Sequence, residues 1–147
     1  MMTRIGICGA LAGALIVAGF ASGALAAEPH GIWLNERKDA HVKLYSCNKD
    51  ELCGEIVWLK RPLGKDGKPR KDVKNDDESL RKRPMLGIQV LWDLEDEGKG
   101  QWEDGEVYNA RDGETYDAEL EVIDANTVKM SGCVWFVCKT ETWTRVK

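Results

Sequence analysis

Residues 107–130, VYNARDGETYDAELEVIDANTVKM, contain the pattern of two successive β-hairpins. Asp112-Gly113 marks the first turn, because this dipeptide fits the tight reversal between antiparallel strands. Polar and apolar residues then alternate from Tyr116 to Val122 and from Val128 to Ser131. An alternation with a period of two turns one set of side chains toward a core and the other toward water. This stretch predicts an antiparallel sheet with one buried face.

The same alternation, interrupted by turn residues, recurs along the rest of the chain. Most connections are short enough for local hairpins, as in an up-and-down barrel. About eight strands result, and eight is the number that closes a small barrel. We therefore predict an all-β fold: one antiparallel barrel of about eight strands with one long charged loop. The expected strands are 31–35, 42–45, 52–59, 88–93, 101–109, 115–122, 128–131 and 140–146.

The long loop, residues 60–84, differs from the other connections in length and charge. It contains ten Lys and Arg residues against five Asp and Glu, so its charge is +5. Residues 76–82 begin with acids and end with bases, which favours one or two helical turns. Long loops in compact domains are uncommon and are often functional.

Residues 93–124 carry the opposite charge, with thirteen acidic residues against Lys99 and Arg111. Two interpretations of this segregation are open. In the first, both segments are solvated surfaces, and the exposed ion pairs between them contribute little. In the second, the basic loop is a lid that guides an anionic ligand or partner to the barrel mouth.

The first 26 residues have the layout of a secretory signal peptide. Arg4 precedes an uncharged run rich in Ala and Gly, and Ala24-Leu25-Ala26 forms a small-x-small cleavage site. The alternative is a membrane anchor, since the run is long enough to span a bilayer. We predict a cleaved leader over 1–26, a single domain over 27–147, and a periplasmic or secreted protein without a stable membrane anchor. Cleavage of the leader would remove Arg4 and change the net charge from −4 to −5. A negative net charge argues against general affinity for nucleic acid.

Four cysteines follow the leader, and an even number in an exported chain predicts disulfides. We favour Cys47–Cys53 and Cys133–Cys138, because each pair brackets a tight reversal between strands. A pairing that joins the two ends of the chain stays open. Neither pair has C-x-x-C spacing, so we predict no zinc site and no other metal or cofactor.

Two short motifs near the ends of the predicted domain resemble the closure motif of lipocalins. Gly31-Ile32-Trp33 lies on the first strand, and Thr142-Trp143-Thr144-Arg145 lies on the last. In that family a Trp of the first strand packs beneath an Arg of the last strand, and a guanidinium over an indole face is a favourable contact. The resemblance implies a lipocalin-like barrel closed at one end by Trp33 and Arg145.

A wider resemblance covers nearly the whole predicted domain. Segments 47–60, 80–89, 105–116 and 132–145 are similar, in this order, to the DUF2147 family of exported bacterial proteins. This family has a lipocalin-like fold and no established activity. The sequence departs from the family pattern at Ala110-Arg111, where a Pro-containing turn is common. It departs again at Trp135-Phe136-Val137, which enlarges the segment between the last two cysteines.

No sequence motif predicts catalysis. No nucleophile signature such as G-x-S-x-G occurs, and His30 and His41 have no marked partners. Asp104, Glu106 and Asp117 are candidates to reach the barrel mouth, so a carboxylate-dependent hydrolase remains an alternative. We predict a protein that is not an enzyme.

A binding module needs an apolar cavity with a few convergent polar groups. Whether the aromatic residues line such a cavity or fill the barrel stays open, because eight strands enclose little space. We hypothesise an exported, non-catalytic protein that binds a small, partly apolar or anionic ligand, with Arg81 and Arg83 attracting a negative group. The alternative is a cell-envelope module that binds another protein through the basic loop. The candidate ligand-binding residues are Arg81, Arg83, Gln89, Trp58, Trp92, Trp102, Tyr108, Asn109 and Tyr116.

Overall fold

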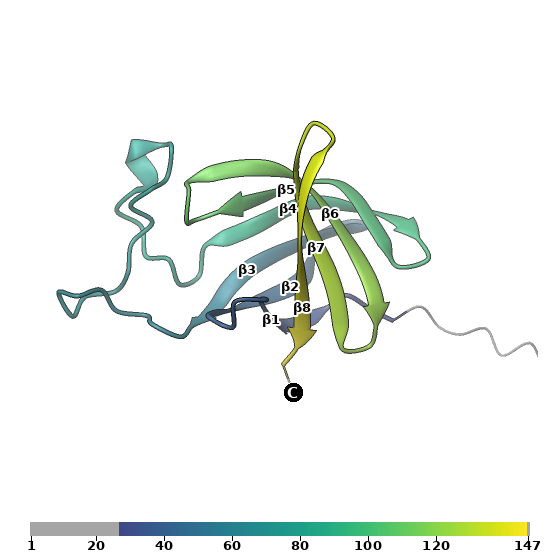
Figure 1. Cartoon of the computed structure of the whole chain (residues 1–147), viewed down its shortest axis with the longest axis horizontal. Coiled ribbons are helices and arrows are strands. Elements are labelled where there is room, and N and C mark those ends of the chain that lie inside the picture. Colours follow the sequence, from purple (N-terminus) through teal and green to yellow (C-terminus); the bar gives the residue numbers. More distant parts are fainter. Residues whose placement is uncertain (1–26, 147) are drawn as a thin grey trace, which may run out of the picture.

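The computed structural model describes residues 27–146, and the expected leader lies outside the described residues. Eight antiparallel strands form a closed barrel in which each strand pairs with its neighbours in sequence and β8 pairs with β1. Figure 1 shows the barrel with the long loop extending to one side. The predicted all-β barrel is therefore confirmed. The strands are β1 Gly31–Leu34, β2 Ala40–Asn48, β3 Glu51–Leu59, β4 Gln89–Gly98, β5 Gln101–Asn109, β6 Glu114–Asp124, β7 Thr127–Val134 and β8 Val137–Arg145.

The meander order gives the barrel two different ends. The connections β1–β2, β3–β4, β5–β6 and β7–β8 lie at one end, which we call the open end. The connections β2–β3, β4–β5 and β6–β7 lie at the other, together with the chain that enters β1. We call this second end the sealed end. In the described part of the chain, no helix is long and apolar enough to cross a membrane.

Trp33 and Arg145 close the sealed end in the arrangement that the lipocalin resemblance implies. The Trp33 side chain is fully buried, and the Arg145 guanidinium lies 4.2 Å from the centroid of its ring. Arg145 also donates hydrogen bonds to the backbone carbonyls of Glu28, His30 and Ala125. These bonds satisfy the guanidinium, so it can cover the indole face and keep water from the core.

The interior near the sealed end is filled with side chains. The most deeply buried large apolar residues come from strands β1, β2, β3, β4, β6 and β7 (Trp33, Leu44, Leu52, Leu91, Leu94, Leu120 and Val128). Strands β4 and β5 approach closely at Gly105, where an added Cβ would lie 2.5 Å from the Trp92 carbonyl oxygen. Because this core lies entirely within the described residues, the chain from residue 27 carries a complete barrel.

Strand β4 departs from the expected alternation. Val90, Leu91 and Leu94 are buried, whereas Trp92 between them is half-buried. Asp93 has a positive φ of 54°, and the pairing of β3 with β4 shifts register beside it. This local twist changes which face the strand presents, so a strict period of two does not describe it.

The long loop between β3 and β4 is an ordered structure. Isolated bridges join Leu63 to Pro69 and Lys71 to Pro84, so the loop doubles back on itself twice. The helical turn expected over 76–82 is a single 3₁₀ turn, η1 Glu78–Leu80, capped by the Asp77 side chain on the backbone N–H of Ser79. Asp72 is fully buried beneath the loop, which fixes the loop to the barrel.

Two disulfides confirm the favoured cysteine pairing. Cys47 is bonded to Cys53 across the β2–β3 turn, and Cys133 is bonded to Cys138 across the β7–β8 turn. Each bond therefore joins two adjacent strands at the root of a hairpin, one at each end of the barrel. The alternative that tied the two ends of the chain together is excluded.

Candidate functional site

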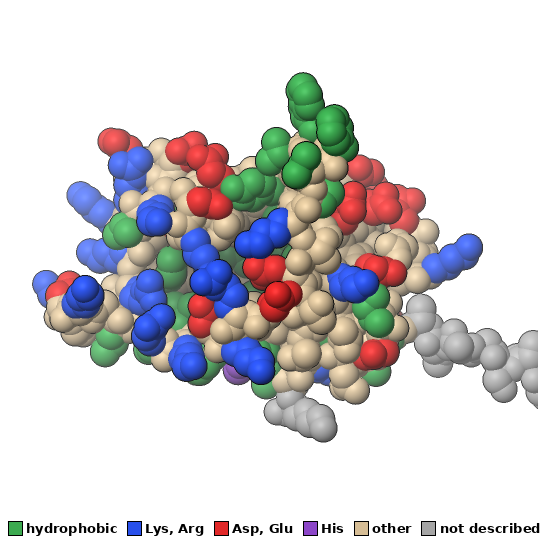
Figure 2. All heavy atoms as spheres, viewed as in Figure 1, with side chains coloured by type: hydrophobic (Ala, Val, Ile, Leu, Met, Phe, Trp, Pro, Cys, Tyr) green, Lys and Arg blue, Asp and Glu red, His purple; other side chains and the backbone are tan. Residues whose placement is uncertain are grey.

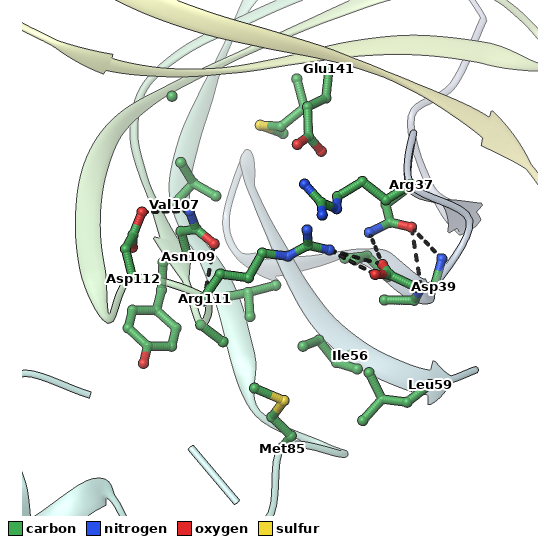
Figure 3. Close-up of a pocket in the computed structure, with 18 of the residues that line it drawn as sticks. Arg37, Asp39, Ile56, Leu59, Met85, Val107, Asn109, Arg111, Asp112 and Glu141 are labelled. Carbon is green, nitrogen blue, oxygen red and sulfur yellow. Dashed lines mark hydrogen bonds and ion pairs between the residues drawn. The ribbon is translucent and has the colours of Figure 1, made fainter. Parts of the chain in front are cut away.

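A cavity of about 550 Å³ opens at the open end of the barrel (Figure 3). Its size lies within the range of small-molecule sites. The apolar part of its wall comes from six strands and from two of the loops that surround the mouth. The apolar lining residues are Ala40, Val42, Ile56, Leu59, Met85, Val90, Val107, Ala110, Met130 and Trp143. The barrel is therefore filled near Trp33 and hollow near the mouth.

Arg111 crosses the mouth of this cavity. It begins in the β5–β6 turn, and its guanidinium donates to both carboxylate oxygens of Asp39 in the β1–β2 connection, at 2.8 and 3.0 Å. Asn35 holds Asp39 in place, because its amide donates to the carboxylate at 2.8 Å and its carbonyl accepts the backbone N–H groups of Asp39 and Ala40. Figure 3 shows this Arg111–Asp39 ion pair between the two connections.

Tyr116 and Asn109 are oriented by Asp112 on the β5–β6 side of the mouth. The Tyr116 hydroxyl and the Asn109 amide both donate to Asp112, at 2.9 and 2.7 Å. The hydrogen bond to Asp112 raises the pKa of Tyr116 above its ordinary value. The Tyr116 hydroxyl donor and one N–H of the Asn109 amide are therefore already used, and Tyr116 offers the cavity its ring rather than its proton.

Four further basic residues surround the mouth. Arg37 comes from the β1–β2 connection, Arg61 and Arg70 from the long loop, and Lys139 from β8. All four are exposed, and within residues 27–146 no carboxylate lies at ion-pair distance from them. Figure 2 shows basic side chains gathered over this face of the molecule. The mouth is therefore electropositive although the whole chain is acidic.

Below the long loop, Tyr108 links the cavity wall to Asp72, the buried residue that fixes the loop to the barrel. Its hydroxyl donates to the buried carboxylate of Asp72, which also accepts from the Arg83 guanidinium at 2.9 Å and from the Asn75 amide at 2.9 Å. Burial, and secondarily the hydrogen bond to Asp72, raises the pKa of Tyr108 to about 12. Tyr108 is therefore a neutral donor that ties β5 to the loop.

Three of the predicted ligand-binding residues line the cavity: Tyr108, Asn109 and Tyr116. Two of the predicted basic residues lie outside it. Arg83 is the partner of Asp72, and Arg81 bonds the Asn75 backbone carbonyl and Glu78. Both hold the loop together and do not face the mouth.

The other four predicted residues also lie outside the lining. Gln89 donates to the sulfur of Cys53 and to the backbone carbonyl of Leu91. Trp58 is exposed and stacks on His41 with ring centroids 4.3 Å apart. Trp102 is part of the filled core, and Trp92 packs against that core from the side because β4 twists at Asp93.

Sequence reasoning missed the residues that dominate the mouth, namely Arg37, Asp39, Arg61, Arg70, Arg111, Lys139 and Glu141. The order of the strands could have located these residues. In a meander barrel alternate connections share one end, so residues of the first, third, fifth and seventh connections converge. Arg111, where the sequence departs from the family pattern, lies in the fifth connection.

The carboxylates that line the cavity are engaged with neighbours. Asp39 is paired with Arg111, and Asp112 accepts from Asn109 and Tyr116. Glu141 accepts a 3.4 Å bond from the Trp143 indole. Asp104, Glu106 and Asp117 are exposed and do not line the cavity. This arrangement suits the binding of a ligand better than acid–base chemistry.

Comparisons with known proteins agree with this fold. A solved structure described as protein HP1028 from the human pathogen Helicobacter pylori, belonging to the lipocalin family, matches with a TM-score of 0.71 and 24% sequence identity. The match covers 82% of this chain and 84% of that chain, and it shows that the fold is lipocalin-like. No curated protein matches the sequence. The family model described as "Uncharacterized protein conserved in bacteria (DUF2147)" matches residues 31–145, so the chain belongs to the DUF2147 family.

Proposed function

We propose that this protein binds a small amphiphilic anion in the open-end cavity, with the apolar part inside the barrel and the acidic group at the mouth. The observation that carries the proposal is the combination of two features in one site. An apolar cavity of about 550 Å³ ends at a rim where five basic side chains outnumber three acidic ones. An anion with an apolar tail satisfies both features at once.

The charges at the rim favour an acidic head group over a neutral one. Arg111 and Asp39 neutralise each other, which leaves Arg37, Arg61, Arg70 and Lys139 without carboxylate partners in residues 27–146. Arg side chains suit carboxylate or phosphate groups because the planar guanidinium donates two parallel hydrogen bonds. A positive rim also raises the rate at which an anionic ligand arrives.

The proposal places this binding outside the cytoplasm. Two disulfides are typical of proteins that fold in an oxidising compartment, and the chain begins with a predicted leader. A periplasmic protein with an apolar cavity can carry an amphiphile through water, where the free ligand is poorly soluble.

The experiment compares three probes that share a twelve-carbon tail: dodecanoate, dodecanol and dodecyltrimethylammonium. Isothermal titration calorimetry measures their affinity for the chain from Ala27, and native mass spectrometry counts the bound molecules. We expect one dodecanoate per chain, bound at least about tenfold more tightly than the cationic probe. Equal affinity for all three probes, or no binding of any, would refute the proposal.

Two variants and one control locate the site. Ala110→Trp places a large side chain in the lining without changing charge and should abolish binding. Arg37→Gln/Arg70→Gln removes two rim charges and should weaken dodecanoate by about tenfold while leaving dodecanol unchanged. Lys49→Gln removes an exposed charge from the β2–β3 turn at the sealed end and should have no effect. An equal loss in Lys49→Gln would show that net charge, and not the rim, attracts the anion.

A further inference from the structure

The tip of the β7–β8 hairpin exposes an unusual set of apolar side chains. Trp135 is 85% exposed and Phe136 is 86% exposed, and Val134 and Val137 beside them are 59% and 69% exposed. Figures 1 and 2 show this tip standing out from the barrel with apolar side chains at its end. Four adjacent apolar side chains that contact so little of their own protein are characteristic of an interaction site.

The tip is held in a fixed shape. The Cys133–Cys138 disulfide joins the strands directly below it, and Val134 pairs with Val137 across the hairpin. Trp135 and Phe136 form the two-residue turn, and their ring centroids lie 6.2 Å apart. The backbone groups below the turn are therefore already paired in hydrogen bonds. Few unpaired polar groups would lose contact with water if the tip entered an apolar environment.

The open end that carries the tip is basic as a whole, whereas Glu119 lies against the disulfide directly below the tip. The hairpin belongs to the open end, as does the long loop with its charge of +5, and Lys139 follows the disulfide on β8. Exposed Lys65 and Lys68 occupy the outer turn of that loop. Figure 2 shows Lys and Arg side chains over the long loop and the adjoining face of the barrel.

We propose that the open end docks reversibly on an anionic lipid bilayer, with Trp135 and Phe136 inserted at the boundary between head groups and acyl chains. Aromatic residues with an apolar body prefer this boundary, and nearby Lys and Arg residues add attraction to anionic head groups. A tip without polar side chains other than the indole N–H suits lipid better than a protein pocket. Docking in this way turns the cavity mouth toward the membrane surface.

The test is a flotation assay with the chain from Ala27, whose strands form the complete barrel. Vesicles are made of phosphatidylcholine alone or of phosphatidylcholine mixed with phosphatidylglycerol. We expect the wild type to float with the anionic vesicles and to bind neutral ones at least about tenfold more weakly. Raising the salt concentration should weaken the binding to anionic vesicles, because screening acts on exposed charges.

Three variants separate the two contributions. Trp135→Ser/Phe136→Ser removes the tip and should weaken binding to anionic vesicles by about tenfold or more. Lys65→Glu/Lys68→Glu should weaken it by a similar factor. The control is Ile123→Ser, which removes an apolar side chain that is 45% exposed at the sealed end and should leave binding unchanged.

Several outcomes would overturn the docking proposal: a wild type that does not float, a tip variant that floats like the wild type, or a tip-dependent dimer in analytical ultracentrifugation without vesicle binding. The tip variant should still bind dodecanoate, because neither residue lines the cavity. Failure of the cavity proposal and failure of the docking proposal are therefore separate results.

Discussion

Replacing Asp72 by Ala should destabilise the protein strongly, because one buried carboxylate holds three side chains. Asp72 is fully buried and accepts from Tyr108, Arg83 and Asn75. Removing one partner of a buried ion pair costs about 3–5 kcal/mol. The Arg83 side chain is 29% exposed and can recover some hydration, so we take the lower half of that range. We expect a loss of about 3–4 kcal/mol, out of a typical total of about 5–15 kcal/mol.

Urea unfolding followed by circular dichroism measures this loss, and hydrogen exchange locates it. The amides of residues 60–84 should lose protection more than those of the eight strands, because Asp72 joins the loop to β5. Asp72→Asn is the matched variant, since it keeps the shape of the side chain and removes its charge. We expect it to cost about half as much, because an amide still accepts one hydrogen bond.

A loss below about 1 kcal/mol in Asp72→Ala, with loop protection unchanged, would refute the reasoning. That result would mean that the loop is held by its own bridges and not by the buried carboxylate. An equal loss in Asp72→Asn and Asp72→Ala would show that charge accounts for the whole effect. The hydrogen bonds from Tyr108 and Asn75 would then contribute nothing.

Two further predictions concern the same contact between loop and barrel. Burial and the hydrogen bond to Asp72 raise the pKa of Tyr108 from 10.0 to about 12, so stability is complete below about pH 10 and falls as the pH rises toward 12, by about 2–3 kcal/mol. Urea titrations at each pH should show this fall in the wild type and a smaller one in Tyr108→Phe, in which Tyr116 still has a raised pKa. In Gly113→Ala the new Cβ would lie 1.7 Å from the Lys74 carbonyl oxygen. The control is Gly67→Ala, where φ is also positive but open space surrounds the residue. Urea unfolding should show a loss of stability about 2 kcal/mol greater in Gly113→Ala than in the control, and equal losses would refute the contact.

Local patterns predicted the architecture because each strand and turn is specified by neighbouring residues. The alternation from Tyr116 to Val122 survives in β6 with Ala118 and Leu120 buried, and the Asp112-Gly113 turn lies where it was expected. Each disulfide likewise brackets a single hairpin. At Asp93 in β4, where φ is positive and the pairing with β3 shifts register, the alternation failed, and Trp92 lies beside the core and not at the cavity.

The candidate site was harder to predict because its residues meet only after the barrel closes. Arg37, Arg70, Arg111 and Lys139 lie on four different connections or strands, and no local pattern distinguishes them from solvated charges. Arg81 and Arg83 were conspicuous in the sequence, but their partners are Glu78 and Asp72 within the loop itself. Tyr108, Asn109 and Tyr116 do line the cavity, because they flank the predicted Asp112-Gly113 turn and this turn lies at the open end.

The two departures from the family pattern both fall on the open end, and the fold explains why this end can change. Arg111 crosses the cavity mouth, and Trp135 and Phe136 form the exposed tip, so none of these three side chains belongs to the buried core. That core includes Trp33 of the Trp33–Arg145 seal, and all of its buried residues except Ile88 belong to strands. Substitutions of exposed residues such as Arg111, Trp135 and Phe136 therefore alter charge, access and surface contacts at little cost in stability, whereas buried residues of the same end, such as Asp72, tolerate few changes. A barrel filled at one end and hollow at the other separates the residues that fold the chain from those available to meet a ligand or a membrane.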